Sequence, residues 1–225
     1  MSDLAPTQSR REALRNAALG AGALAAAGLV SPALAAGQSA ADEDLRDFLV
    51  EAISLEQLAV LAYGTAAREG EAKLRATMEA FRDQEQAHAT ALRAALDSLG
   101  FDLPDAPDSS ADGGAFEGVE GLSEDAATDL GKRLSELERL ERPAQYPAYL
   151  LELESLQLAY YASAGPEVES VDLTTTSAEI AGCQAQHIVV LGGELGQTPA
   201  EAVARATDAA GRAPADDGSE TDASG

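Results

Sequence analysis

The sequence predicts an all-α fold, and three observations support this prediction. Hydrophobic residues make up 45% of the chain, with alanine and leucine prominent among them, whereas aromatic residues make up only 4% and tryptophan is absent. Such a composition favours helices over a β-sandwich. Apolar residues also recur at helical spacing in four long stretches, which glycine and proline separate. The 225 residues suffice for one domain of ordinary size with tails.

Residues 1–36 are predicted to be an export signal. The run Ser9-Arg10-Arg11-Glu12-Ala13-Leu14-Arg15 resembles a twin-arginine signal, an apolar run follows, and Ala33-Leu34-Ala35 is a candidate cleavage site. No charged residue occurs from Asn16 to Ala41, so an uncleaved membrane anchor is the alternative. Alanine and glycine make this run weakly hydrophobic, which favours cleavage. We therefore expect an extracytoplasmic or secreted protein, held at the membrane if the signal stays, with a linker at residues 37–41.

A helical hairpin is expected after the linker. The first helix is predicted over residues 42–69, and it opens with acidic residues that suit the positive end of a helix dipole. Gly70 is a plausible end for this helix. The second helix is predicted from about Glu71 to Leu99, where Gly100 stops it. So short a turn implies that the two helices are antiparallel.

A long connection separates this hairpin from a second pair of helices. Residues 101–120 are rich in Pro, Gly, Asp and Ser and predict a loop, and Ser123 could cap a smaller helix to about Leu140. Pro143 fits the first turn of a third long helix that ends at Ala164. After a loop at residues 167–175, a fourth helix is predicted from about Thr176 to Leu195.

The last part of the chain is expected to hold one short helix and a tail. Thr198 followed by Pro199 predicts a capped helix that runs to about Ala206. Residues 208–225 are acidic and contain few apolar side chains, so they are predicted to be disordered.

The strongest signal in the sequence is a repeat between the two pairs of helices. The chain has two histidines, and both occupy matching points of this repeat. From Glu56 to His88 there are 32 residues, and from Glu154 to His187 there are 33. A tyrosine also follows each glutamate after seven residues, Tyr63 in the first half and Tyr161 in the second.

The acidic residues of the repeat lie on apolar helical faces. Positions three, four and seven apart share one face of a helix. Ile53 and Val60 therefore flank Glu56, whereas Glu85 precedes His88 by three residues among apolar neighbours. A buried carboxylate is costly unless something compensates its charge.

This pattern resembles the ferritin-like superfamily over roughly residues 42–196. In that superfamily a four-helix bundle holds two metal ions, with one Glu from each of two helices and a Glu-x-x-His from each of the others. The resemblance implies a ferritin-like four-helix bundle over residues 42–207, with a long crossover between the second and third helices. The implied metal ligands are Glu56, Glu85, His88, Glu154, Gln184 and His187.

One position departs from the family pattern. Gln184 stands where a Glu is expected before His187, and in the family that Glu usually bridges the two metals. Two divalent ions bring four positive charges, whereas Glu56, Glu85 and Glu154 supply three negative ones. A site for one ion on Glu56, Glu85, His88 and Glu154 therefore competes with a site for two.

The resemblance implies one or two iron ions, or manganese, as the cofactor. Carboxylates with imidazole are a ligand set that these metals accept. The implied activities are those of an oxidase, a ferroxidase or a peroxide-removing enzyme. Tyr63 and Tyr161 could hydrogen-bond to ligand carboxylates and orient them, or could be core residues. Cys183 is expected to be a small buried residue, with a soft metal ligand or an intermolecular thiol as alternatives.

A second function class stays open. If the site has lapsed, the chain would be a metal-free ferritin-like scaffold that acts as a structural or binding module. Hydrogen bonds would then have to hold the three buried carboxylates, some of them protonated. Stoichiometric metal binding distinguishes the two classes.

The charge of the chain bears on its partners. The formal net charge is −24, which disfavours nucleic acid and anionic membrane surfaces and attracts metal cations. Together with the export signal, this acidic composition resembles secreted proteins of extreme halophiles; an acidic protein from a high-GC bacterium is the alternative. A homodimer is compatible with the sequence but is not specified by it.

Overall fold

The computed structural model describes residues 40–101, 116, 119–164 and 171–210. This part of the chain is helical throughout, with six α-helices joined by turns and no strand, so the predicted all-α fold is confirmed. The predicted export signal, most of the predicted loop at residues 101–120 and residues 211–225 of the predicted tail lie outside the described residues. Residues 208–210, predicted as part of the disordered tail, belong instead to the last helix, Pro199–Ala210. The chain divides into two compact units, Met1–Glu138 and Arg139–Gly225, here called the N-terminal and C-terminal units.

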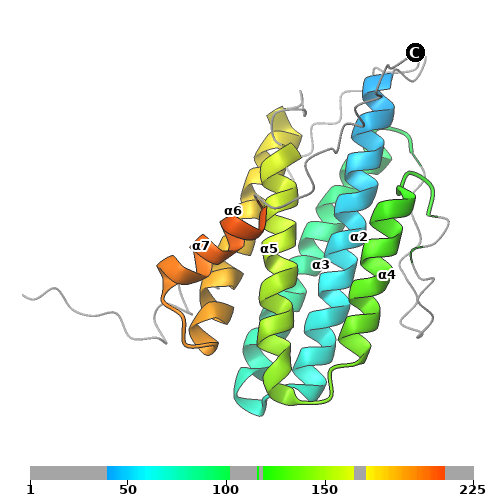
Figure 1. The fold of residues 1–225 in the computed structure, drawn as a ribbon. Coiled ribbons are helices and arrows are strands. Elements are labelled where there is room, and N and C mark those ends of the chain that lie inside the picture. The colour runs from blue at the N-terminus through cyan, green and yellow to red at the C-terminus, as the bar shows by residue number, and fades with distance from the viewer. Residues whose placement is uncertain (1–39, 102–115, 117–118, 165–170, 211–225) are drawn as a thin grey trace, which may run out of the picture. The chain divides into compact units, whose positions relative to one another are not determined.

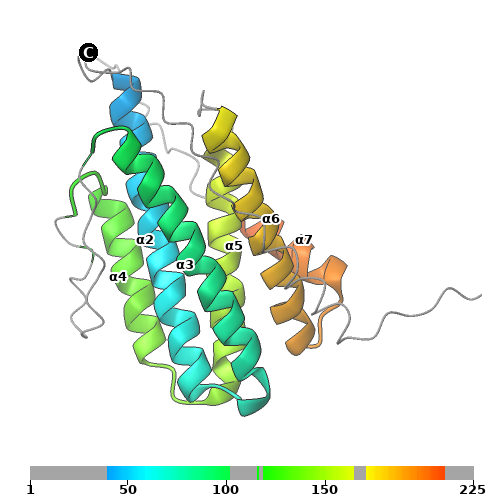
Figure 2. The ribbon, with the colours of Figure 1, turned by 180° about the vertical axis from the view of Figure 1, so that it is seen from behind.

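The N-terminal unit is built on one long helical hairpin. Helix α2 spans Ala40–Glu69, the 3-10 turn η2 spans Ala72–Leu74, and helix α3 spans Arg75–Ser98. Helices α2 and α3 pack side by side and run antiparallel (Figures 1 and 2), as the short turn predicts. Helix α4, Glu124–Glu138, packs against α2.

Gly70 makes the tight turn of this hairpin possible. Its backbone N–H donates a hydrogen bond of 2.9 Å to the carbonyl oxygen of Ala66. A Cβ atom at position 70 would overlap that same oxygen, so a side chain cannot be accommodated without moving the backbone. The predicted helix end is therefore correct, and its cause is the close approach of two backbone segments.

Helix α2 contains a long apolar segment. The stretch Glu43–Glu69 contains an 18-residue window with a mean hydropathy of 1.3, long and apolar enough to cross a membrane by length and composition alone. However, 72% of this window is buried inside the protein. Leu49, Ile53 and Leu58 are fully buried, as expected for the central helix of a packed core.

The C-terminal unit holds a second antiparallel pair. The turn η3 at Pro143–Gln145 leads into helix α5, Tyr146–Ala164, and helix α6 spans Val171–Glu194. Helices α5 and α6 pack side by side and run in opposite directions (Figure 1), and helix α7, Pro199–Ala210, packs on both.

Helix α6 begins five residues before the predicted start at Thr176, so the prediction of a loop was wrong for residues 171–175. Threonine has a modest helix propensity, which led to the later predicted start. In the structure the hydroxyl of Thr176 donates a hydrogen bond of 3.0 Å to the carbonyl oxygen of Asp172 one turn earlier. Thr176 thus satisfies its hydroxyl within the helix.

Helix α7 reaches the core through Gly192 of α6. A Cβ atom at position 192 would lie 2.5 Å from the Cβ of Ala202, so the glycine is needed where the two helices touch. The start of α7 is capped as predicted: the backbone N–H of Glu201 donates to the Thr198 hydroxyl at 3.3 Å. The Glu201 carboxylate accepts from the backbone N–H of Thr198 at 2.7 Å, which completes a capping box.

Candidate metal centre

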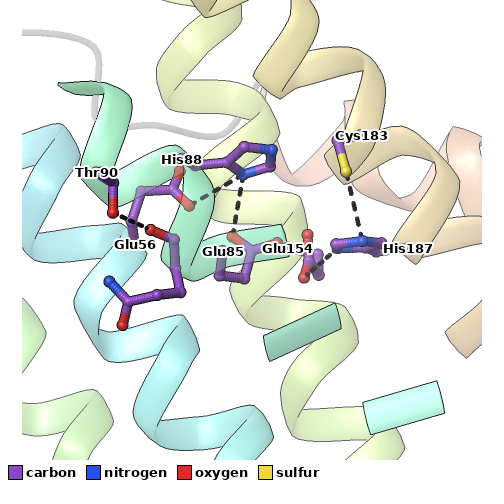
Figure 3. Close-up of polar contacts among 8 residues, drawn as sticks. Glu56, Glu85, His88, Thr90, Glu154, Cys183 and His187 are labelled. Carbon is purple, nitrogen blue, oxygen red and sulfur yellow. Dashed lines mark hydrogen bonds and ion pairs between the residues drawn. The ribbon is translucent and has the colours of Figure 1, made fainter. Parts of the chain in front are cut away.

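The N-terminal unit brings three of the predicted ligands together. Glu56 lies in the middle of α2, and Glu85 and His88 face it from α3, one helical turn apart (Figure 3). The two carboxylates are fully buried, and His88 is 6% exposed. One ligand atom from each of the three residues can be chosen so that all lie within 4.8 Å of one another. This group could hold a metal ion.

The spacing within this group suits a bound cation. Nδ1 of His88 lies 3.4 Å from Oε2 of Glu56 and 3.6 Å from Oε2 of Glu85. Both distances exceed the usual range of a nitrogen–oxygen hydrogen bond, about 2.7–3.2 Å. Two ligand atoms that each lie about 2.1 Å from one ion are separated by roughly 3 Å or more. The group therefore has the spacing of a ligand set.

The electrostatic surroundings of Glu56 disfavour its ionised form. Burial raises the pKa of Glu56 well above its ordinary value of 4.5, and the charge of Glu85 raises this pKa further. His88 acts in the opposite direction but does not cancel the effect. Burial and the neighbouring carboxylate thus disfavour the ionised form of Glu56, and a bound cation would favour it.

Tyr63 packs beside this group. It is fully buried, and its ring meets the ring of Phe81 edge-on with centroids 5.6 Å apart. Phe81 lies one turn before Glu85 on α3, so this aromatic pair packs the hairpin next to the carboxylates. The structure supports a packing role for Tyr63, and its predicted role in orienting a carboxylate stays a prediction.

The C-terminal unit brings together a different set. Glu154 of α5 is fully buried, and its Oε1 lies 3.0 Å from Nδ1 of His187 on α6 (Figure 3). On the other side of the ring, Nε2 of His187 lies 3.5 Å from Sγ of Cys183. Gln184 is fully buried on the same helix. The roles of Glu154, Gln184 and His187 as metal ligands stay predictions.

Tyr161 occupies the corresponding place in α5. It is buried and meets the ring of Tyr160 edge-on, with centroids 5.8 Å apart. As for Tyr63, aromatic packing is the contact that the structure shows. Its predicted hydrogen bond to a ligand carboxylate stays a prediction.

Sequence reasoning underestimated Cys183. A small buried residue was expected, but the side chain is only half-buried and its sulfur contacts the histidine ring. The spacing was a usable signal, because residues four apart on a helix are neighbours. The ring orientation of His187, which decides whether the sulfur faces a nitrogen, is a tertiary property that the spacing does not give.

The helices and the buried Glu/His groups define a class of protein: all-helical, with carboxylates and imidazoles arranged as they are in metal-binding bundles. Comparison with known families identifies the same class of protein. The model of the ferritin-like domain family matches residues 41–197, more than two thirds of the chain. The chain therefore belongs to the ferritin-like family. Neither a curated protein nor a solved structure gives a significant match.

Proposed function

We propose that the N-terminal unit binds an iron or manganese ion through Glu56, Glu85 and His88. The observation that carries this proposal is the convergence of two buried carboxylates and one imidazole within 4.8 Å. Oxygen and imidazole ligands suit both metals. Two carboxylates and a divalent ion are neutral together, so the bound state removes the cost of the buried negative charge.

Each residue has a distinct part in this proposal. Glu56 presents a carboxylate from α2, and the i, i+3 pair of Glu85 and His88 presents two further ligands from α3. The rigid hairpin holds the three donors in place before an ion arrives, which lowers the cost of binding. Iron at this position would supply one-electron chemistry with dioxygen or peroxide, so we propose an oxidase, ferroxidase or peroxide-removing activity.

A metal-free structural or binding module is the second candidate, and one observation favours it. In the C-terminal unit, Glu154 already has a hydrogen-bond partner at 3.0 Å in His187. This unit shows that the chain can hold a buried carboxylate with its own side chains. If the N-terminal group does the same by protonating Glu56, whose pKa is raised, the protein needs no ion.

Metal content decides between the two candidates. The purified protein would be reconstituted anaerobically with Fe(II) or Mn(II), desalted and measured by elemental analysis. Glu85→Gln should abolish binding by the N-terminal group, because it removes one of the two carboxylates. Glu79→Gln, the same change at an exposed position of α3, is the matched control and should leave the metal content unchanged. Equal metal content in the two variants would refute the proposal.

We also propose export by the twin-arginine route, on the basis of Arg10, Arg11 and the apolar run that follows them. Replacing both arginines by lysine should retain the protein in the cytoplasm of its host. Fractionation of the cells, with immunodetection of the chain, would measure this. Export of the doubly substituted chain at the normal level would contradict the proposal.

A further inference from the structure

Three side chains of the C-terminal unit form a continuous chain of contacts. Sγ of Cys183 lies 3.5 Å from Nε2 of His187, and Nδ1 of the same ring lies 3.0 Å from Oε1 of Glu154 (Figure 3). Cys183 and His187 are one turn apart on α6, whereas Glu154 belongs to α5. The imidazole is therefore held at both nitrogens, by its own helix on one side and by the neighbouring helix on the other.

The hydrogen-bond donors and acceptors of this chain can be assigned from chemistry. If Glu154 is ionised, its carboxylate only accepts hydrogen bonds, and Nδ1 of His187 then carries the proton that is donated to Glu154. In a neutral ring Nε2 is then an acceptor and requires a donor. The S–H group of Cys183 is such a donor. In this arrangement every group has a complementary partner.

A thiol also suits the opposite arrangement. If a cation took the lone pair of Nδ1, the proton of the ring would move to Nε2, and the sulfur of Cys183 would accept a hydrogen bond from it. An alanine at position 183 would serve neither tautomer, and a carboxylate would serve only the second. A group that both donates and accepts can stay in place in either case.

We propose that Cys183 is a positioning residue, which holds the ring of His187 with Nδ1 directed at Glu154 in both tautomers. In the metal-free protein this role concerns only the C-terminal unit. Its use in metal binding rests on the proposed function, because partners of a ligating histidine fix its orientation and tautomer. Because Cys183 is only half-buried, its side chain contributes less to core packing than a fully buried residue would.

The two histidines make the metal-free test direct. The protein would be labelled with ¹⁵N-histidine, and long-range ¹H–¹⁵N spectra would report the tautomer and hydrogen bonding of each ring. The wild-type protein and Cys183→Ser should show His187 protonated at Nδ1 with a hydrogen-bonded Nε2, because a serine hydroxyl also donates and accepts. In Cys183→Ala the Nε2 resonance should move to the position of a nitrogen without a hydrogen bond. His88, in the other unit, is the internal reference and should not move.

Zn(II) serves as a diamagnetic probe in the second part of the test. Titration should shift the proton of His187 from Nδ1 to Nε2 in the wild type and in Cys183→Ser, and the affinity should fall about tenfold in Cys183→Ala. If the alanine variant moves the metal-free resonance but Zn(II) leaves His187 unchanged in every variant, the positioning role stands and a role of His187 as a ligand fails. Identical metal-free resonances of His187 in all three proteins would overturn the positioning role.

Discussion

The two units place a glutamate and a histidine on paired antiparallel helices, but they treat the buried charge differently. In the N-terminal unit, His88 lies 3.4 and 3.6 Å from two carboxylates, neither of them within the usual range of a hydrogen bond. In the C-terminal unit, His187 forms one contact of 3.0 Å with the single carboxylate of Glu154. Within each unit, two carboxylates lie near His88 and one lies against His187, and we propose that this difference sets how strongly each group depends on a cation.

The difference follows from one position in the repeat. Glu85 of α3 and Gln184 of α6 each precede a histidine by three residues, and both side chains are fully buried. A carboxylate at this position adds a second buried charge, whereas an amide is neutral. We propose that the number of carboxylates per imidazole sets how strongly a helix pair of this kind depends on an ion.

The largest effect is expected from removing the histidine of the C-terminal unit. His187→Ala leaves Glu154 buried without its imidazole, and breaking a buried pair in this way costs about 3 kcal/mol. The equivalent His88→Ala should cost less in the metal-free protein, because the raised pKa of Glu56 allows it to become neutral. Urea denaturation in EDTA would measure both free energies of unfolding. Equal losses would contradict the proposed difference between the units.

The next prediction concerns a substitution that gives the C-terminal unit the Glu-x-x-His pattern of the N-terminal unit. Gln184→Glu gives the C-terminal unit a second buried carboxylate, so the metal-free protein should lose about 2 kcal/mol of stability at pH 8. Excess Mn(II) should restore the lost stability, which denaturation would measure. It should also increase the metal content of the protein, which elemental analysis would measure. Gln86→Glu, at an exposed position of α3, is the matched control for adding a charge. A loss that Mn(II) does not reduce would show that charge balance is not the relevant difference.

Much of this architecture could be predicted from the sequence, because it depends on local patterns. The period of the apolar residues predicts the helices, and the spacing of Glu85 and His88 predicts that both side chains share one face. The family resemblance then implies Glu56 as a further ligand, and the structure places its carboxylate 3.4 Å from Nδ1 of His88.

The features that sequence reasoning missed depend on tertiary contacts. The contact of Cys183 with Nε2 requires the orientation of the His187 ring, and the spacing of the two residues does not fix that orientation. The need for glycine at position 192 of α6 arises from Ala202 of α7, which lies against it. The early start of α6 brings Leu173 into the buried core, which the local sequence does not indicate.

The pH dependence of the metal-free protein should show the raised pKa of Glu56 directly. The pKa of Glu56 is raised in the folded state above its ordinary value of 4.5, so the folded protein binds this proton more tightly than the unfolded chain. The resulting stabilisation is fully present below pH 4.5 and is lost as the pH rises through the folded-state pKa. The free energy of unfolding of the wild type relative to Glu56→Gln should therefore fall with rising pH in EDTA. Saturating Mn(II), which binds the ionised form, should remove this fall, and a flat difference in EDTA would contradict the assignment.

The smallest effect tests whether the two units respond separately. Thr198→Ala removes the cap of α7 in the C-terminal unit, and the loss of such a cap costs about 1 kcal/mol. The exposed Glu201 of the same capping box has a lowered pKa, caused first by the backbone hydrogen bond from Thr198. The contribution of this carboxylate to stability should therefore disappear as the pH falls through that pKa. In Thr198→Ala, amide hydrogen exchange should become faster in α7 and should stay unchanged in α2 and α3. Metal uptake by Glu56, Glu85 and His88 should also stay the same. Faster exchange at the N-terminal hairpin would mean that the units share one cooperative transition, and the balance of each group could then not be treated as a property of its own helix pair.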